Sequence, residues 1–226
     1  MRIAVRPPEY MPRVSYVALM KYVDVFVVAD TFQYSRQSFQ NRARIRTPHG
    51  WSWISVPLMG RQHGTPIYQT QIDNRSAWRS KHRRAFQYNY GNTIYYPFFE
   101  DRVAGIYEAE WNTLADLTWS TIKLFHELFS LKCKLIRASE MEGIRNSLPA
   151  ILDQFKYDEY VSPGASFDKD KEVVATISRF EYSEPRYRQH FEGFEPEITA
   201  FDVLCNYGAE AAGQVSAGFR VQGSGF

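Results

Sequence analysis

The pattern of hydrophobic and polar positions divides the chain into alternating strand-like and helix-like segments. Short, β-branched apolar runs at Arg2–Val5 and Val25–Ala29 predict buried strands. A helix is predicted between them over Arg13–Tyr22, after a loop that Pro8 and Pro12 keep out of helical geometry. This order of strand, loop, helix and strand forms a βαβ unit, which predicts a parallel sheet with a right-handed crossover.

A second pattern, strict alternation of residue types, follows the second strand. The segments Asn41–Arg46 and Trp51–Leu58 both alternate, and a Pro-His-Gly turn separates them, so they predict a β-hairpin. Its first strand places three arginines on one face, namely Arg42, Arg44 and Arg46. An arginine face suggests a site for an anionic group, and the alternative is a solvated charged face.

The remaining segments continue the α/β pattern. Further strands are predicted over Pro66–Ile72, Lys134–Ile136 and Tyr157–Ser162, an aromatic loop over Asn89–Phe99, and helices over Ser76–Tyr88, Glu100–Phe129 (one helix or a pair), Asn146–Phe155 and Thr199–Asn206. The sequence therefore predicts an α/β fold, a Rossmann-like parallel or mixed sheet with helices on both faces and an inserted basic β-hairpin. Residues 1–208 are expected to form a single domain, and residues 209–226, rich in small residues and glycine, a frayed C-terminal tail.

Charge changes this picture because it is unevenly distributed. The 226-residue chain carries a net charge of only +2. Residues 36–84 contain ten Lys and Arg against one acid, Asp73, so this segment carries +9 and the rest of the chain carries −7. A concentration of positive charge within one segment favours an anionic ligand or partner.

Two features bear on the compartment. The chain has two cysteines, Cys133 and Cys205, and two isolated cysteines indicate reduced structural thiols rather than a disulfide framework or a zinc site. The amino terminus lacks a long apolar segment, and no run approaches the ~20 apolar residues of a membrane span. We therefore expect a cytoplasmic protein without a membrane partner.

Known catalytic motifs are absent. The sequence has no Walker A loop, dinucleotide-binding fingerprint, HExxH, GxSxG or paired CxxC motif, and no acidic cluster with metal-ligand spacing. No cofactor is therefore predicted from a motif, although Asp30 could help to hold Mg²⁺ on a nucleotide phosphate. Among candidate acids and bases, His82 stands beside Lys81 and two arginines, whose charges would lower its pKa and favour a neutral base. The alternative is an ordinary polar helix residue.

The predicted site lies where the first loop approaches the end of the second strand, because open α/β sheets bind ligands at the carboxyl ends of their strands. Asp30 and His82 are the candidate catalytic residues. The candidate residues for substrate or phosphate binding are Arg6, Tyr10, Gln33, Tyr34, Asn41, Arg42, Arg44, Lys81 and Ser162, the last at the carboxyl end of another predicted strand.

Six segments carry a resemblance to a known family. They are IAVRPPEYMP near the amino terminus, DVFVVADTFQYSRQSFQNRARIRTPHGWSWISVPL at Asp24–Leu58, WRSKH at Trp78–His82, YYPFF at Tyr95–Phe99, DEYVS at Asp158–Ser162 and FEPEITAFDVLCNYG in the last quarter. Their order and spacing across nearly the whole chain resemble the WbqC-like family. Members of that family are found with O-antigen, other polysaccharide or secondary-metabolite genes, and a glycine transferase role has been suggested for them.

The resemblance implies a transferase of polysaccharide or secondary-metabolite biosynthesis that acts on a phosphate-bearing activated small molecule. A nucleotide, a nucleotide-sugar or an aminoacyl carrier would fit, and glycine or aminoacyl transfer is among the reactions implied. The chain departs from the family in its first loop, where Arg6-Pro7-Pro8 replaces the usual His-Gln-Pro and Arg13 replaces a tryptophan. Arg6 can neutralise a phosphate, but it cannot exchange protons, so the resemblance carries no acid–base role over to this loop.

Two other functions also fit the sequence. The first is a non-catalytic binding module that docks tRNA or another acidic partner through the basic segment 36–84; a carrier protein is a further candidate partner of the chain. The second is a catalytically silent scaffold within a biosynthetic complex, for which the departure at Arg6 is the only indication.

Overall fold

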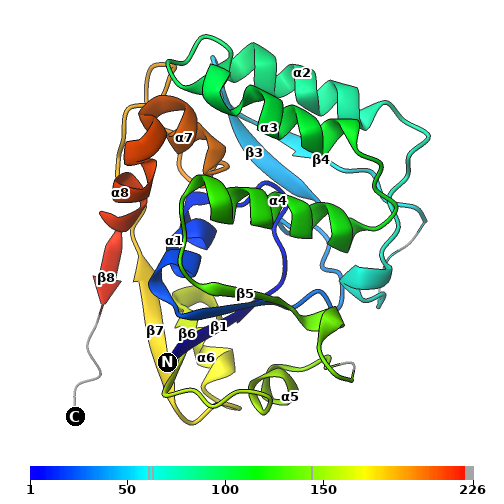
Figure 1. The fold of residues 1–226 in the computed structure, drawn as a ribbon, viewed down its shortest axis with the longest axis vertical. Coiled ribbons are helices and arrows are strands. Elements are labelled where there is room, and N and C mark those ends of the chain that lie inside the picture. Colours follow the sequence, from blue (N-terminus) through cyan, green and yellow to red (C-terminus); the bar gives the residue numbers. More distant parts are fainter. Residues whose placement is uncertain (61, 63, 144, 222–226) are drawn as a thin grey trace.

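The computed structural model describes residues 1–60, 62, 64–143 and 145–221, and its main feature is a six-stranded sheet in the order β5-β2-β1-β6-β7-β8 (Figure 1). Five of these strands are parallel: β1 (Arg2–Arg6), β2 (Val25–Val28), β5 (Lys134–Arg137), β6 (Glu159–Pro163) and β7 (Ile177–Tyr182). The last strand, β8 (Phe219–Val221), is antiparallel to β7. The predicted α/β fold with a parallel sheet is confirmed.

Helices cover both faces of the sheet. They are α1 (Val14–Tyr22), α2 (Trp78–Tyr90), α3 (Tyr96–Glu108), α4 (Leu114–Leu128), α5 (Leu148–Leu152), α6 (Gly164–Asp170), α7 (Phe201–Tyr207) and α8 (Ala211–Ser216), with short 3₁₀ turns η1 (Ile67–Gln69), η2 (Ala138–Glu140) and η3 (Gly208–Glu210). Phe26 and Val28 of β2 belong to the core that α1 and α4 complete. Val25 and Val27 of the same strand pack on the opposite side, with Ile151 of α5. A strand that is apolar at every position therefore lies between two cores.

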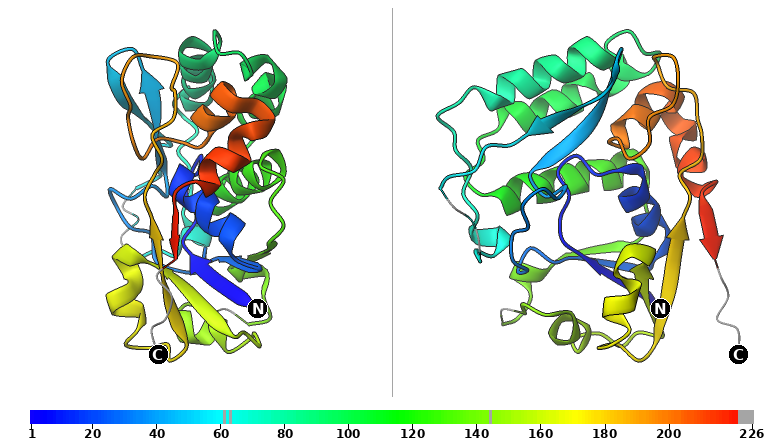
Figure 2. Two further views of the ribbon diagram at one scale, coloured as in Figure 1. Left: turned by 90° about the vertical axis from the view of Figure 1, so that its left-hand side faces the viewer. Right: turned by 180° about the vertical axis from the view of Figure 1, so that it is seen from behind.

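The predicted hairpin forms a separate two-stranded antiparallel sheet from β3 (Arg42–Thr47) and β4 (Gly50–Ser55). Its register runs from Arg42 opposite Ser55 to Thr47 opposite Gly50. Ala43, Ile45 and Ile54 are buried in the same core as residues of α2. Figure 2 shows the hairpin beside α2 and α3, away from the large sheet. The insertion therefore adds a second, smaller layer to the molecule.

One predicted strand is wrong. Pro66–Ile72 alternates in sequence, but the chain forms the 3₁₀ turn η1 there and makes only isolated bridges, from Pro66 to Gln33, from Gln71 to Thr113 and from Ile72 to Leu58. Pro66 cannot donate to a sheet, and its carbonyl accepts the side-chain hydroxyl of Thr70 at 3.1 Å, which closes the turn.

The helices at residues 89–129 also differ from the prediction. The aromatic segment Asn89–Phe99 is a loop only between α2 and α3, because Pro97 lies in the first turn of α3, where no backbone donor is needed. The long helical pattern resolves into the pair α3 and α4. Thr113 begins α4 by accepting the Asp116 amide at 3.2 Å, which is an ordinary N-cap.

The C-terminal segment is structured further than the sequence indicated. Where a frayed tail was predicted from residue 209, the chain forms η3, α8 and β8. Ala211 and Val215 of α8 are buried in the large core, and the hydroxyl of Tyr182 in β7 donates to the Val215 carbonyl at 3.1 Å. Small residues pack here because they allow close approach. Residues 222–226 lie outside the described part of the chain.

The strand order places the switch point of the sheet between β1 and β6. From β1 the chain moves to β2 and β5 on one side, and then returns to β6, β7 and β8 on the other. The connections leave the carboxyl ends of β1 and β6 in opposite directions, which opens a crevice where α/β proteins bind ligands.

None of the helices in the described parts of the chain has both the length and the hydrophobicity needed to cross a lipid bilayer.

Candidate functional site

A cavity of about 620 Å³ lies at this switch point, and we call it the switch-point cavity. Arg6 and Pro7 border it from the end of β1, and residues of α6 border it from the end of β6. Val5 of β1 and Tyr160 of β6 also line it, and the remaining walls come from three further stretches of the chain: Phe32 and Gln33, Asn146–Pro149, and Glu172 and Val173. Its volume falls within the range of small-molecule sites in proteins.

Arg6 is the central cation of the switch-point cavity. Its Nη1 donates to the hydroxyl of Ser166 in α6 at 2.8 Å, so the guanidinium bridges the ends of β1 and β6. Lys169, on the same helix as Ser166, also lines the cavity. The cavity lining also contains two acids, Asp170 and Glu172, so the candidate anion site within it is the Arg6 guanidinium beside the Ser166 hydroxyl. The flat guanidinium fork can bind phosphate with two parallel hydrogen bonds.

The cavity also holds a carboxylate with a fixed orientation. Asp170 Oδ2 accepts the Ser162 hydroxyl at 2.6 Å and the Tyr160 hydroxyl at 3.0 Å. Ser162, predicted to complete the pocket, is itself fully buried. It therefore acts on the cavity through Asp170, since the carboxylate lines the cavity and the serine does not.

Asp30 occupies a different environment from the predicted one. Its side chain is 1% exposed and accepts the Arg137 Nε at 2.7 Å, the Ser139 amide at 2.9 Å and the Ser139 hydroxyl at 2.6 Å. These contacts join the ends of β2 and β5. A carboxylate with both oxygens engaged in this way is suited to holding strands together, and it does not line the switch-point cavity.

The other predicted residues are divided between three places. Gln33 lines the switch-point cavity with Arg6, as the βαβ geometry indicated. Tyr34 donates to Asn41 Oδ1 at 2.9 Å, and Asn41 Nδ2 donates to the Val56 carbonyl at 2.9 Å, so this pair holds the base of the hairpin. Tyr10 is fully buried, its hydroxyl contacts His82 of α2, and it does not line the switch-point cavity.

The arginine face of the hairpin exists, but its charges are engaged within the molecule. Arg42 donates to the backbone carbonyls of Gln37 and Ser38 and stacks 3.9 Å from the Trp53 ring centre. Arg44 stacks on Trp51 at 4.2 Å, and its Nη1 pairs with Glu197 at 3.0 Å. The rings beside Arg42 and Arg44 are thus tryptophans of β4, which bind guanidinium groups by stacking.

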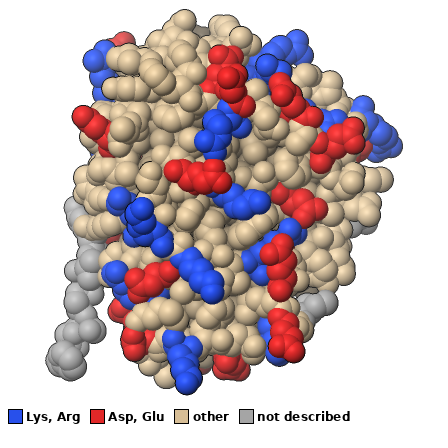
Figure 3. All heavy atoms as spheres, in the orientation of Figure 1, with Lys and Arg blue, Asp and Glu red and all other residues tan. Residues whose placement is uncertain are grey.

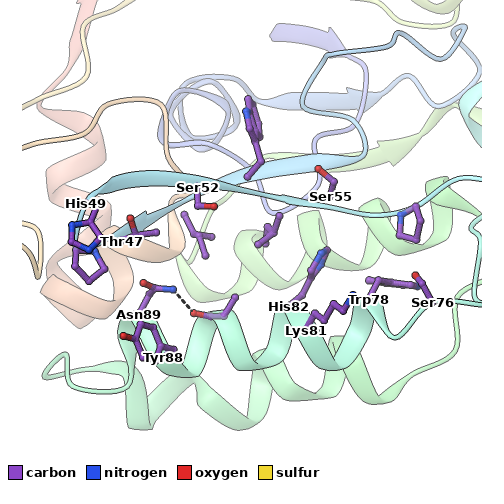
Figure 4. A pocket seen from close by; sticks show the side chains of 16 residues that line it. Thr47, His49, Ser52, Ser55, Ser76, Trp78, Lys81, His82, Tyr88 and Asn89 are labelled. Carbon is purple, nitrogen blue, oxygen red and sulfur yellow. Dashed lines mark hydrogen bonds between the residues drawn. The ribbon is translucent and has the colours of Figure 1, made fainter.

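A second hollow of about 600 Å³, the hairpin groove, lies between the hairpin and α2 (Figure 4). Lys81, His82 and Asn89 of α2 face Ser52 and Ser55 of β4 across it. It shares no lining residue with the switch-point cavity. The structure therefore separates the predicted Lys81 and His82 from the predicted Arg6 and Gln33.

His82 is a buried member of a hydrogen-bonded chain. Its Nδ1 lies 2.9 Å from the Tyr10 hydroxyl, which lies 2.8 Å from the Tyr107 hydroxyl. Burial lowers the pKa of His82 to about 4, and a hydrogen bond with the backbone of Ser55 acts in the opposite direction. The predicted direction is confirmed, but the cause is burial rather than repulsion by neighbouring cations.

We predict that His82 stays neutral throughout the physiological range. In a pH titration followed by NMR, its ring protons should show no protonation step between pH 8 and about 5.5, because the pKa is near 4. The His82→Gln variant would assign the signal. A step with a midpoint between pH 6 and 7 would show that the ring is far better solvated than its 5% exposure indicates.

Several residues of the switch-point cavity were not found from the sequence. They are Ser166, Lys169, Asp170, Asn146 and Ser147. The predicted strand end at Ser162 was the only nearby signal, because a helix that follows such a strand brings its residues to the same edge. Within the described residues, no cluster of three or more His, Cys, Asp or Glu is arranged to hold a metal ion.

Comparison with known proteins agrees with the motifs in the sequence. The model of the WbqC-like protein family matches residues 7–214. The "Uncharacterized protein Rv1507c" of Mycobacterium tuberculosis (strain ATCC 25618 / H37Rv) is 32% identical over 222 residues, which cover 93% of this chain and 95% of that protein. No solved structure matches the chain. Because the family match spans nearly the whole of the described fold, the chain belongs to the WbqC-like protein family.

Proposed function

We propose that this protein is a transferase that binds a phosphate-bearing activated small molecule in the switch-point cavity. The observation that carries the proposal is the position of Arg6, at the carboxyl end of β1 and hydrogen-bonded across the crevice to Ser166. A permanently charged, planar group at the switch point of a parallel sheet suits a phosphate or diphosphate.

Within this proposal each wall of the cavity has a part. Arg6 and Lys169 neutralise the phosphate, and they would stabilise the charge that develops on it as it leaves. Gln33, Asn146 and Ser147 offer hydrogen bonds to the polar body of the ligand. The apolar side chains of Phe32 and Leu148 cover a flat, less polar part.

Asp170 is the candidate proton acceptor. Two hydroxyls donate to its Oδ2, and among the described residues none donates to Oδ1, which leaves that oxygen for an incoming hydroxyl or amine. In this proposal the base therefore lies on α6 rather than on the first loop. It also accounts for how an enzyme with Arg6-Pro7-Pro8 could work without a loop histidine, because Arg6 would bind and Asp170 would accept the proton.

The substrate classes are activated molecules that carry a phosphate. In a nucleotide or nucleotide-sugar the phosphate belongs to the leaving group, whereas in an aminoacyl carrier the thiol of the arm leaves and the phosphate only anchors the arm. A nucleotide, a nucleotide-sugar or a phosphopantetheine-type aminoacyl carrier would satisfy Arg6 and Lys169, and the family resemblance favours polysaccharide or secondary-metabolite biosynthesis. Transfer of glycine or another aminoacyl group belongs to the same proposal. Mg²⁺ would arrive bound to the phosphates of a nucleotide, and Asp170 or Glu172 could contribute a ligand to it.

A thermal-shift screen tests the proposal. Nucleotides, nucleotide-sugars, amino acids and coenzyme A derivatives would be tested with and without Mg²⁺. At about 100 times its Kd, a ligand of the native state should raise the Tm by roughly 5–10 °C in a domain of this size. If no phosphate-bearing compound stabilises the protein, the proposal fails.

The alternative function, docking of tRNA or another acidic partner through segment 36–84, makes a different prediction. Nucleic-acid affinity falls steeply with salt, whereas the affinity of a pocket for a small anion falls much less. Figure 3 shows acidic and basic side chains interspersed on one face of the molecule. Arg83 pairs with Glu108 at 3.0 Å and Arg44 with Glu197 at 3.0 Å, so acids outside the segment balance part of its positive charge.

A further inference from the structure

The strand β4 leaves one edge of the hairpin sheet open. On β3, the Arg44 carbonyl accepts the Thr199 amide at 2.8 Å and the Arg46 amide donates to the Tyr90 hydroxyl at 3.0 Å. The backbone amides and carbonyls of these two residues therefore point away from β4. In an antiparallel pair, the backbone groups of the directly opposite residues also point away from the partner strand. Those residues are Trp53 and Trp51. The Val56 amide donates to the Asn41 carbonyl at 2.7 Å, which fits this alternation.

The outward groups of β4 are mostly unused. Among the described residues, no hydrogen bond reaches the backbone amides or carbonyls of Trp51 and Trp53, and only Ser55 is engaged, through His82. Edge strands usually carry a lysine, a proline or a bulge that prevents pairing with other chains. The sequence of β4, GWSWIS, contains neither lysine nor proline, and its register with β3 is unbroken.

The hairpin groove runs beside this open edge. Its walls are β4 on one side and α2 on the other, so a chain laid against β4 would point alternate side chains at α2 (Figure 4). Ile54, Trp78 and Ala85 contribute an apolar surface. An edge strand with a helix-walled groove is the arrangement used for peptide recognition by strand addition.

Two polar features of the groove indicate what such a chain would carry. Lys81 lines the groove, and none of the lining residues is acidic, so its charge is complementary to a carboxylate. Asn89 is 6% exposed, and its Oδ1 has no hydrogen-bond partner among the described residues, while its Nδ2 donates to the Ala85 carbonyl at 2.8 Å. Exchanging the oxygen and nitrogen of the Asn89 side-chain amide would place its oxygen against the Ala85 carbonyl, and both are acceptors. The groove therefore offers an unpaired acceptor, Asn89 Oδ1, for an N–H or O–H donor.

We propose that the open edge of β4 and the hairpin groove together bind an extended peptide with an acidic side chain. The peptide pairs with the backbone amides and carbonyls of Trp51 and Trp53. Its groove-facing side chains rest on the apolar surface, the acidic one reaches Lys81, and a hydrogen-bond donor reaches Asn89 Oδ1. Its outward side chains lie beside the two tryptophans, of which Trp51 is 39% exposed.

The partner is therefore a protein with an acidic segment in extended conformation, either at a terminus or in a loop. This surface is independent of the proposed transfer reaction, because the groove and the switch-point cavity have no residue in common. Through this surface the protein can bind another protein without blocking the switch-point cavity.

The test uses fluorescein-labelled peptides about seven residues long, of alternating valine and threonine, with glutamate placed in either of the two central positions. Fluorescence anisotropy with the full-length protein should show saturable binding of at least one of them. Replacing its glutamate with lysine, or methylating the central backbone amides that would pair with β4, should each weaken binding about tenfold or more. Hydrogen exchange at the Trp51 and Trp53 amides should slow in the complex.

Variants of the protein complete the test. The exposed Lys81→Glu substitution should weaken the glutamate peptide about tenfold and favour the lysine peptide, and Lys81→Arg should retain binding of the glutamate peptide. The Arg6→Met variant should bind it as the wild type does. The proposal is overturned if neither glutamate peptide binds, if binding is insensitive to backbone methylation, or if β4 instead pairs with a second copy of the chain and excludes the peptides.

Discussion

Replacing Arg46 with methionine is expected to lower the free energy of unfolding by about 3–5 kcal/mol. The guanidinium is 2% exposed, and its Nε donates to Gln189 Oε1 at 3.0 Å and its Nη1 to the Gly50 carbonyl at 2.7 Å. It also donates to the carbonyls of Thr47 and Glu192. Methionine would fill much of the volume but leave these buried acceptors without a donor, which is the costly part. Urea denaturation at neutral pH measures the loss.

The matched control is Arg42→Met on the same strand. Arg42 is partly exposed, and it bonds two carbonyls and stacks on Trp53, so water can replace much of what is lost. We expect a decrease of about 1 kcal/mol or less. Equal decreases in the free energy of unfolding of the two variants would contradict the interpretation that the hydrogen bonds of Arg46 hold the hairpin to residues 189–192.

The free energy of unfolding of the Asp202→Asn variant, measured relative to that of the wild type, is expected to rise by about 2–3 kcal/mol between pH 5 and pH 8. Asp202 is fully buried in α7, and neither carboxyl oxygen has a hydrogen-bond partner among the described residues. Burial raises its pKa to about 7, although Tyr187 and Arg46 act in the opposite direction. Asparagine has nearly the same shape and no charge to bury.

The sign follows from the protons bound in each state. Between its unfolded pKa of 3.8 and its folded pKa of about 7, Asp202 is protonated in the native state and ionised in the unfolded chain. Its contribution to stability is therefore complete below pH 4 and is lost as the pH rises to 7. Denaturation curves for both proteins at several pH values measure this difference, and a difference that does not vary with pH would contradict it.

The comparison between variant and wild type is needed because other groups titrate in the same range. Burial also raises the pKa of Glu184 to about 7, which adds a loss of the same sign. His82 has the opposite effect on stability. Its folded pKa of about 4 lies below the unfolded value of 6.5, so as the pH falls the unfolded chain binds the proton first and stability decreases. Subtracting the Asn variant from the wild type isolates Asp202.

Local pattern predicted much of the fold. The apolar runs at β1 and β2 are buried on both sides of a parallel sheet, and such strands can be recognised without knowledge of the rest of the chain. The alternation of β3 and β4 and the turn between them specify a hairpin in the same way. The segment Pro66–Ile72 shows the limit, because its alternation was real but a strand also needs a neighbour to pair with.

The surroundings of the candidate residues could not be predicted, because they come from distant parts of the chain. Arg44 and Arg46 share a face as expected. Glu197 pairs with Arg44, and Gln189 accepts a hydrogen bond from the buried Arg46, and both partners lie about 150 positions later in the chain. Asp30 likewise meets Arg137 and Ser139 only in the folded state. Charge segregation along the sequence is thus a poor guide to charge in space when the partners lie far away in the chain.

The location of the site at the end of β1 was predictable from topology, and its composition was not. Arg6 and Gln33 meet because a βαβ unit places the first loop beside the end of the second strand. Lys169 and Asp170 join them because α6 follows β6, the strand across the switch point. No property of residues 164–170 in isolation marks them as part of a site.

We have proposed that Arg6 binds the phosphate of a ligand in the switch-point cavity, and calorimetric titration of wild type and Arg6→Met is the decisive test. The titrant is the phosphate-bearing compound that most stabilises the wild type. We predict that Arg6→Met binds it about 10- to 100-fold more weakly, because a charge-assisted hydrogen bond is lost, while Lys81→Met binds it unchanged. Equal affinity in wild type and Arg6→Met, or a loss in Lys81→Met alone, would contradict the claim and move the site to the hairpin groove.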